Sequence, residues 1–358
     1  MTTDHHDLTT LFAAGSCADR PAASPYQALR TMIVGGDVRL KALWAFVTLG
    51  IPLILKDGPR ASDDVAAVCE ADRSKMRRFL YAMHAYGLVD RDPAGRYGLT
   101  AMGRVLLPGE GSMWAEVGVT MAPLWQEAGE RLPETIRIGH PAILRDHAAP
   151  HALLARDRQL APLFDMFMDG QSRAVGDALA DRDYSSVRTV AVAGGGARNV
   201  LDTILRAHPH LKGILIERSR VAERAEHHRA EQEVADPVQL ADADMFSDLC
   251  PPADVIILPL VLHNHDDTDS RLLLAHVGDA LRKAGPLARL WCIETLLPEP
   301  GVCTSATDLD IRMMTLFADG QERTLEQYQE LMQLAGLDII ATEALPADQT
   351  LMIAQPAA

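Results

Sequence analysis

The stretch TVAVAGGGARNVL, residues 189–201, decides the fold of this 358-residue chain. It begins with a short apolar β-forming run, turns through three glycines, and continues into a helical pattern from about Asn199 to Ala207. Further strand-like runs, with a helix at 270–281 before the last of them, are predicted at 213–217, 255–260 and 290–294. Strands that alternate with helices in this way predict a parallel sheet with crossover helices.

Two more apolar runs, Leu337–Ala344 and Leu351–Ala354, lie near the end of the chain. Only a few residues separate them, which is too short for a helical crossover, so they are expected to pair as an antiparallel hairpin. A parallel sheet closed by such a hairpin differs from a plain dinucleotide-binding fold.

The segment before residue 110 has a different pattern. Apolar residues recur at helical spacing from Leu40 to Val47, and the motif Asp-Gly-Pro at 57–59 interrupts them. Ser62 is a predicted N-cap for a helix that runs to Cys69, and a second helix is predicted over Ser74–Tyr86. Two short strands around a turn at 92–95 follow. Three helices followed by a hairpin predict a winged helix.

A winged helix suggests DNA binding, and Arg73, Lys75, Arg77 and Arg78 make one helix locally basic. The charge balance favours another interpretation. Residues 1–110 carry 13 basic and 12 acidic side chains, and the remainder carries 21 basic and 37 acidic ones. Because an acidic surface repels phosphate backbones, nucleic acid is not an expected partner. We expect a solvated helix face in a dimerisation domain.

The length suggests about two domains. The longest uncharged apolar stretch, Ala42–Leu55, has 14 residues, fewer than the ~20 that a bilayer span needs. The N-terminus lacks the pattern of a secretion signal. The five cysteines are scattered and lack CxxC spacing, so we expect reduced thiols in a cytoplasmic protein without a structural zinc site. They are Cys17, Cys69, Cys250, Cys292 and Cys303.

The three glycines, Gly194, Gly195 and Gly196, allow a ligand to approach the backbone next to the amides of a helix N-terminus. Glu217 follows the last of them by 21 residues and ends the next predicted strand, where a carboxylate can accept both hydroxyls of a ribose. The pair favours an adenosine-type cofactor. A tight strand-to-helix turn is the alternative explanation of the glycines.

The sequence VLHNHDD, residues 261–267, directly follows a predicted buried strand. Ligands bind outside the carboxyl ends of such strands, and histidine has a pKa suited to proton abstraction near neutral pH. His263 is therefore a candidate general base. The alternative is a helix-capping loop in which Asp266 or Asp267 is the cap and His263 only packs. His265 could join these residues around a metal, but histidine pairs recur elsewhere in the chain, so no metal is expected.

Together these motifs resemble the S-adenosylmethionine-dependent O-methyltransferase family of plant caffeate and bacterial polyketide-tailoring enzymes, from about Arg39 to Ala354. The matching segments, in family order, are 49–52 with 57–59, 78–80 with 86–89, 194–196, 208–209, 244–246, 261–263 with 266–267, 293–298 and 320–324. The resemblance implies a mainly α N-terminal winged-helix dimerisation domain and an α/β Rossmann-like methyltransferase domain that ends in an antiparallel β-hairpin. The implied division is an arm at 1–25, the winged helix at 26–110, a helical connector at 111–184 and the α/β domain at 185–358.

The resemblance also implies the site. His263 would take the proton of a substrate hydroxyl, and Glu294 and Glu322 would flank it and fix its tautomer. S-adenosylmethionine would be held by Gly194, Gly195, Gly196, Arg198, Glu217, Asp244, Met245 and Phe246. An aromatic or polyketide-type small molecule would be enclosed by Met121, Trp125, Phe164, Met168, Met313, Met314 and Phe317. Other implied properties are a homodimer and a role in natural product biosynthesis.

Five positions depart from the family pattern. Val192 stands where the first strand usually carries an acid, and Arg198 replaces the last glycine of the usual GGGxG loop. Glu217 replaces the usual ribose-binding Asp, and Asn264 and His265 replace the Asp and Trp that usually follow the histidine. Arg198 would either pair with the cofactor carboxylate or hinder the cofactor. The base side is better preserved than the cofactor side, so the alternative function is a non-methylating relative, a hydroxylase or a cyclase/rearrangement catalyst with degraded or absent cofactor use.

Overall fold

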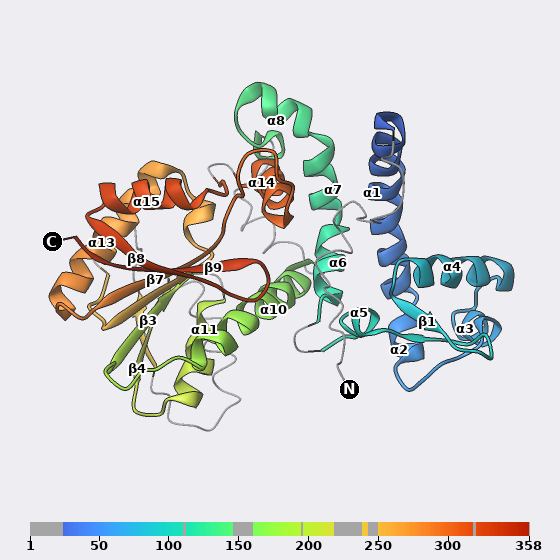
Figure 1. Cartoon of the computed structure of the whole chain (residues 1–358), viewed down its shortest axis with the longest axis horizontal. Helices are drawn as coiled ribbons and strands as arrows, with labels where there is room; N and C mark the ends of the chain where they lie inside the picture. The colour runs from blue at the N-terminus through green and yellow to red at the C-terminus, as the bar shows by residue number, and fades with distance from the viewer. Residues whose placement is uncertain are drawn as a thin grey trace.

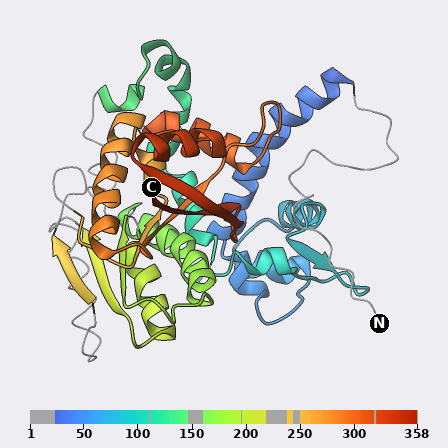
Figure 2. The ribbon, with the colours of Figure 1, turned by 60° about the vertical axis from the view of Figure 1, so that its left-hand side comes forward.

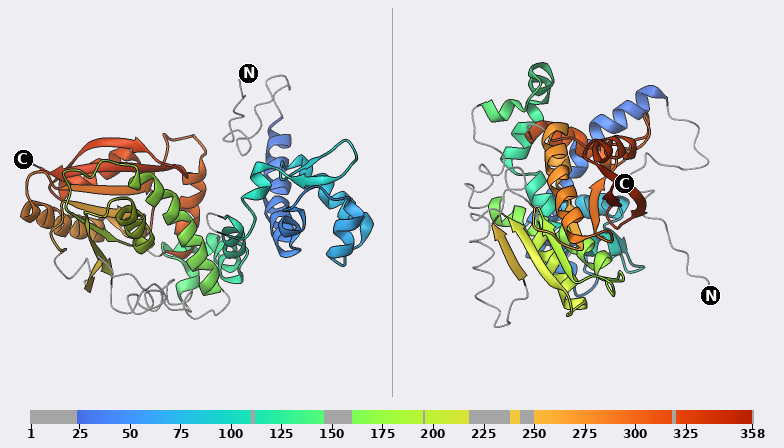
Figure 3. Two further views of the ribbon diagram at one scale, coloured as in Figure 1. Left: turned by 90° about the horizontal axis from the view of Figure 1, so that it is seen from below. Right: turned by 90° about the vertical axis from the view of Figure 1, so that its left-hand side faces the viewer.

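The computed structural model describes residues 24–109, 112–145, 160–194, 196–217, 238–242, 250–317 and 320–357. The expectations on Cys17, Gly195 and residues 244–246, and on all but the end of the N-terminal arm, lie outside these ranges. Within them, an N-terminal helical part and a C-terminal α/β part lie on opposite sides of a group of connecting helices (Figure 1; Figure 3, left).

The N-terminal part has the predicted order of helices followed by an antiparallel strand pair. Its elements are α1 (Pro25–Thr48), α2 (Ile51–Leu55), α3 (Ser62–Val68), α4 (Arg73–Ala85), β1 (Val89–Arg91), β2 (Tyr97–Leu99) and α5 (Ala101–Arg104). Helix α1 is longer than predicted, and α2 was not predicted. Its core includes Phe46, Leu55 and Leu80, all fully buried.

The predicted cap of α3 is wrong. Ser62 is the first helical residue, and Ala61 precedes it in an extended conformation without a side-chain cap. Acidic residues at positions 63 and 64 of the first turn favour the positive end of the helix dipole, so α3 begins without a capping hydroxyl. In α4 the cap is Asp72, whose side chain accepts a hydrogen bond from the backbone N–H of Lys75.

The N-terminal half of α1 projects away from the rest of the chain (Figure 2). Its apolar side chains remain exposed instead of packing on this chain. They are Tyr26, Leu29, Met32, Ile33, Val34 and Val38. Exposed apolar side chains in this number on one helix favour an interaction site.

The described part of the connecting segment is mainly helical, as expected for the helical connector. It contains α6 (Trp114–Thr120), α7 (Pro123–Glu130), α8 (Leu132–Ile138), the 3₁₀ helix η2 (Ala142–Arg145) and α10 (Leu160–Ala180). Helix α6 packs against both α1 and α10, and α10 packs against α11 of the α/β part. This chain of contacts joins the two parts.

The C-terminal part is built on a sheet of seven strands among the described residues, in the order β5-β4-β3-β6-β7-β9-β8. Its elements are β3 (Thr189–Ala193), α11 (Ala197–Ala207), β4 (Lys212–Glu217), β5 (Val238–Asp242), β6 (Val255–Pro259), η3 (Leu262–Asn264), α13 (Asp267–Ala284), β7 (Arg289–Thr295), α14 (Ser305–Leu316), α15 (Leu325–Leu334), β8 (Leu337–Ala344) and β9 (Gln349–Pro356). The strands from β5 to β7 are parallel, and β9 is antiparallel to both β7 and β8. The predicted terminal hairpin is therefore confirmed.

Helices cover both faces of this sheet. Alternate residues of each strand point to opposite faces. In β3, Ala191 and Ala193 join the core beneath α13 and α15, whereas Val190 and Val192 join the core beneath α10 and α11. Fully buried strands of this kind appear in the sequence as continuous apolar runs, which is why β3 and β6 were predicted to within a residue or two.

Two expectations from composition can be compared with the described residues. None of the helices within them is both long and apolar enough to cross a bilayer. Cys69, Cys250, Cys292 and Cys303 are free thiols.

Candidate functional site

His263 lies at the carboxyl edge of the sheet, in the short helix η3 that follows β6. The chain turns sharply at Leu260, which has a positive φ of 53°. The backbone N–H of Leu260 donates to Ile293 of β7 at 2.8 Å, and the side-chain amide of Asn264 donates back to Leu260 at 3.1 Å. These bonds place His263 at the edge where ligands bind in sheets of this type.

Glu294, near the end of β7, is hydrogen-bonded to the backbone of this turn. Its side chain is fully buried, and Oε1 accepts hydrogen bonds from the backbone N–H groups of Val261 (3.1 Å) and Leu262 (2.8 Å). The position of η3 therefore depends on one buried carboxylate from the neighbouring strand.

Glu322 contacts the imidazole directly. Nδ1 of His263 lies 2.9 Å from Oε1 of Glu322, whose side chain is fully buried, while 12% of the His263 side chain is exposed. The backbone N–H of Gln321 donates to the carbonyl of His263 at 2.9 Å, and that of Glu322 donates to Asp310 at 2.9 Å. With a proton on Nδ1, the imidazole donates to the carboxylate, and Nε2 is the ring nitrogen that can accept a proton.

Burial and mutual charge perturb the ionisation of these groups. Burial raises the pKa of Glu294 to about 7, and the charge of Glu322 acts in the same direction against the opposing effects of His263 and the two backbone N–H groups. Burial alone would lower the pKa of His263, but the hydrogen bond to Glu322 and the charges of both glutamates outweigh it and raise that pKa. The imidazole is therefore a stronger base than an isolated histidine.

Arg323 was not singled out by the sequence, although it lies next to Glu322. It is only 2% exposed, and its guanidinium donates to the carbonyls of Leu262 (3.1 Å) and His265 (2.8 Å) and to Asp267 (2.7 Å). The signal available was its place in the motif at 320–324. Its partners are 56 to 61 residues away, so no local pattern could identify them.

The capping interpretation of the segment 261–267 is confirmed for one of its two aspartates. Asp266 caps α13 by accepting from the backbone N–H of Asp269 at 2.8 Å. Asp267 pairs with Arg323, so the metal set considered from the sequence does not form. Another group does bring three possible ligand atoms within 4.8 Å of one another: His263, Glu294 and Glu322. One polar atom of each side chain already takes part in a hydrogen bond within the protein: Nδ1 of His263 and Oε1 of each glutamate.

At the expected cofactor end, glycines make the turn between β3 and α11. Gly194 and Gly196 have positive φ values of 112° and 74°. A Cβ atom would lie 2.4 Å from Cγ2 of Val261 at the first position and 2.6 Å from Cβ of Ser172 at the second. The turn must therefore be glycine for packing reasons as well as for backbone conformation.

The sheet topology gives this turn the surroundings that an adenosine-type cofactor requires. Strand β3 lies between β4 and β6, so the strand order reverses beside it. Glu217 ends β4, and the register pairs its neighbour Ile216 with Ala193, so the backbone at Glu217 reaches the same edge as the glycine turn. Arg198 forms an ion pair with Asp202 one helical turn later, at 2.7 Å. Val192 is buried in the core beneath α11.

Most of the expected substrate-pocket residues gather near α14. Trp125, Phe164 and Phe317 belong to one apolar cluster with Phe167, and Met313 is buried. A Cβ atom on Gly320 would lie within 2.9 to 3.0 Å of Met313, of Phe317 and of the His263 carbonyl, so these groups converge beside η3. Met168 and Met121 are partly buried, on α10 and just after α6.

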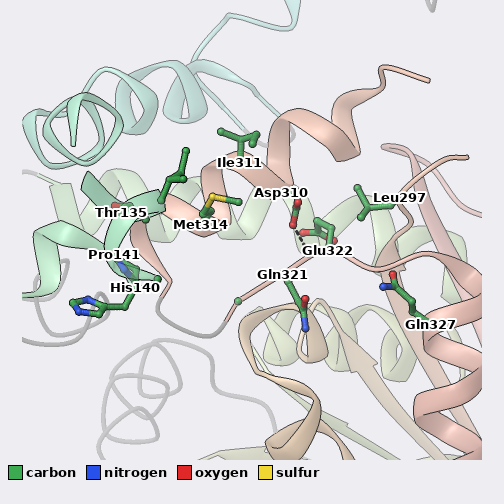
Figure 4. A pocket seen from close by; sticks show the side chains of 13 residues that line it. Thr135, His140, Pro141, Leu297, Asp310, Ile311, Met314, Gln321, Glu322 and Gln327 are labelled. Atoms are coloured by element: carbon green, nitrogen blue, oxygen red, sulfur yellow. Dashed lines mark hydrogen bonds between the residues drawn. The ribbon is translucent and has the colours of Figure 1, made fainter. Parts of the chain in front are cut away.

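Met314 does not join this group. It lines a cleft of about 760 Å³ on another face of α14, together with Thr135, His140 and Ile311 (Figure 4). Residues that are adjacent on a helix point about 100° apart, so Met313 and Met314 point in different directions. Asp310 and Glu322 border the same cleft, where the bond between them is visible in Figure 4.

Replacement of Glu294 by Gln tests the buried carboxyl. A carboxyl whose pKa is raised by folding contributes stability that is complete below its ordinary value of 4.5 and is lost as the pH rises through about 7. Gln keeps an oxygen acceptor for Val261 and Leu262 but cannot ionise. The free energy of unfolding of Glu294→Gln should therefore rise relative to the unsubstituted protein between about pH 4.5 and pH 7.5, measured by denaturant titration.

The exposed Glu299→Gln substitution is the control and should show no such trend. A difference between Glu294→Gln and the unsubstituted protein that stays constant with pH would contradict the assignment.

Residues 132–338 match the O-methyltransferase domain family, and residues 33–109 match the O-methyltransferase dimerisation domain. The chain is 28% identical to mitomycin biosynthesis 6-O-methyltransferase of Streptomyces lavendulae, over 86% of this chain and 88% of the relative. It is 35% identical to aclacinomycin 10-hydroxylase of Streptomyces purpurascens, over 62% of this chain and 59% of the relative.

A methyltransferase of calicheamicin biosynthesis, solved in an SAH-bound form, superposes with a TM-score of 0.81 at 26% identity, over 94% of this chain and all of that one. The domain match covers more than half of the present chain and includes His263, Glu294 and Glu322. The chain is a methyltransferase that belongs to the O-methyltransferase family.

Proposed function

We propose that this protein transfers a methyl group from S-adenosylmethionine to a hydroxyl of an aromatic or polyketide-type small molecule in secondary metabolism, with His263 as the general base. The observation that carries the proposal is the contact between His263 and Glu322, placed by Glu294 at the carboxyl edge of the sheet. The match to the O-methyltransferase domain and the named relatives support it.

In this proposal His263 accepts the hydroxyl proton on Nε2, and Glu322 stabilises the resulting imidazolium through Nδ1. Glu294 acts as a positioning residue, because it holds the backbone of η3. The wall of Met313 and Phe317 beside η3 keeps the hydroxyl within reach and excludes water.

The cofactor would lie against the glycine turn at 194–196, with Glu217 toward its ribose; residues 244–246 would contact its adenine. When bound, it supplies a methyl group on a positively charged sulfur, a strongly electrophilic centre. Val192 is buried in the core, so in this proposal Glu217 is the acidic residue that binds the cofactor at this edge of the sheet. Arg198, anchored by Asp202, stands at the helix start, where we propose that it meets the cofactor carboxylate.

The alternative function, a non-methylating tailoring reaction, has one specific observation in its favour. The relative with 35% identity is a hydroxylase, and it matches over 62% of this chain. Both functions require the same His263 site, and the two differ in whether the methyl group leaves the cofactor.

We propose that two copies of the chain pair through the dimerisation domain, with the chain divided as expected at residues 26–110, 111–184 and 185–358. The exposed apolar face of α1, which includes Met32 and Ile33, supports this assembly.

Light scattering of the purified protein should give twice the single-chain mass of 38.9 kDa. Replacement of Met32 and Ile33 by Glu should reduce this mass toward that of one chain, because like charges would face each other across a two-fold contact. A single-chain mass for the unsubstituted protein would contradict the homodimer.

Replacement of His263 by Ala should lower turnover of a phenolic acceptor by about 10² to 10⁴, because the base is lost while the binding sites remain. Calorimetric titration with S-adenosylhomocysteine should give the same affinity in the variant and the unsubstituted protein. Near-normal turnover would contradict the role of His263. Failure of the folded protein to bind either form of the cofactor would contradict methyl transfer, and binding without methylated product would favour the alternative function.

Replacement of Glu322 by Gln should change the pH profile of turnover as well as its magnitude. A general base must be neutral, so turnover rises with pH as His263 loses its proton. Because Glu322 raises the pKa of His263, its removal should move the rising limb to lower pH and lower the plateau. The exposed Glu326→Gln substitution serves as control. If the rise of turnover with pH occurs at the same pH in Glu322→Gln and in the unsubstituted protein, Glu322 does not act directly on the pKa of His263.

A further inference from the structure

Arg312 of α14 places a cation among aromatic side chains. Its guanidinium carbon lies 5.2 Å from the ring centroid of Trp125 and 6.0 Å from that of Phe167. Its Nη2 atom is buried and has no hydrogen-bond partner. Buried polar groups are almost always hydrogen-bonded, and those of a charged group especially so, because an unmet donor loses its hydration without compensation.

A second unmet donor lies in the same cluster. Nε1 of Trp125 is buried without a hydrogen-bond partner, and the ring that carries it is the one that Arg312 contacts. Buried indole N–H groups usually find an acceptor. Two neighbouring side chains therefore present N–H groups with no acceptor among the described residues, which is the complement of an oxygen-bearing ligand.

Glu116 of α6 is the charged group that acts on Arg312, but it does not satisfy it. Burial raises the pKa of Glu116, and Arg312 opposes this effect; burial in turn lowers the pKa of Arg312 against the attraction of Glu116. The effect of each group on the other is coulombic, without a hydrogen bond between them. The carboxylate therefore balances the charge of the guanidinium but leaves Nη2 without an acceptor.

The cluster continues toward the proposed base. Trp125 and Phe167 each lie 6.0 Å from Phe164, measured between ring centroids, and Phe317 packs on the same cluster. Phe317 is also one of the groups that converge with the His263 carbonyl around Gly320. A flat aromatic acceptor that presents its hydroxyl to His263 would therefore extend along rings that end at Arg312.

We propose that Arg312 and Trp125 form a specificity-determining subsite that binds a carboxylate on the aromatic acceptor, at the end remote from the methylated hydroxyl. A guanidinium fork and an indole N–H match the two oxygens of a carboxylate, and the anion replaces the partner that the buried cation lacks. The inference rests on the proposed function, because it assigns the substrate class of the same site.

The test is a binding measurement that requires no methyl transfer. The probes are a hydroxynaphthoic acid with its hydroxyl and carboxyl groups on opposite rings and the methyl ester of the same compound. Calorimetry should show that the unsubstituted protein binds the acid more tightly than the ester. In Arg312→Gln the acid should lose about 10- to 100-fold in affinity and the ester should change little, since the lost bond is to a charged group.

Three further variants sharpen the result. Trp125→Phe keeps an aromatic ring and removes the indole N–H group. It should therefore lower the affinity for the acid by a smaller factor, about 3- to 10-fold. Glu116→Gln removes the repulsion of a nearby carboxylate and should strengthen binding of the acid. Arg137→Gln, an exposed arginine of α8, is the matched control and should leave both affinities unchanged.

Equal affinity for acid and ester in the unsubstituted protein, no binding of either probe, or selectivity retained in Arg312→Gln would each overturn the proposal. If Arg312→Gln does not fold, the opposite shifts expected for Trp125→Phe and Glu116→Gln decide the question, and their absence overturns it. Selective binding of the acid by a protein that transfers no methyl group would support the subsite and contradict the proposed function.

Discussion

The hydrogen bonds of the Arg323 guanidinium are the constraint on which the site depends. Arg323 donates to two carbonyls and one carboxylate of the segment 262–267, while Glu294 accepts from the start of the same segment. A cation from one side and an anion from the other thus fix a turn that has little regular structure of its own. Burying a charge costs free energy, and this cost is offset only where the charged group is fully hydrogen-bonded. All three nitrogens of the Arg323 guanidinium donate hydrogen bonds.

The same arrangement accounts for the basicity of His263. Burial of Glu294, with the charge of Glu322 beside it, raises the pKa of Glu294. The hydrogen bond to Glu322 and the charges of both glutamates raise the pKa of the imidazole. An apolar substitute at either position would pack with less penalty, but it would leave the backbone of η3 or Nδ1 of His263 without an acceptor. Burial of the two glutamates is unfavourable in itself, but the buried carboxylates set the position and the pKa of His263.

Local patterns predicted the fold where burial is continuous. Strand β3 is buried on both faces and was predicted with its observed ends, and the terminal hairpin follows from the short connection between its strands. Strand β5 and α14 were not predicted, because β5 is only partly buried at the sheet edge and α14 packs mainly through a few residues of mixed polarity.

The site divides in the same way. His263, Glu294 and Glu322 were expected from motifs that resemble a known family. The partners of Arg323 lie too far along the chain for any spacing rule to reveal. The ion pair between Arg198 and Asp202 is different, because its i,i+4 spacing on a predicted helix could have indicated it. Spacing in the sequence can identify neighbours within one helix or strand. The site, however, is formed by residues from several helices and strands.

In the proposed function, helix α14 connects recognition of the acceptor with the base. Asp310 accepts from the backbone N–H of Glu322, which contacts His263, and two residues later Arg312 enters the aromatic cluster. One helix therefore supports both Glu322, which contacts His263, and the aromatic cluster that we propose to bind the acceptor. If the proposed roles hold, substitutions at Arg312 would change which acceptor binds, while the hydrogen bond between Asp310 and Glu322 would keep the site of His263 intact.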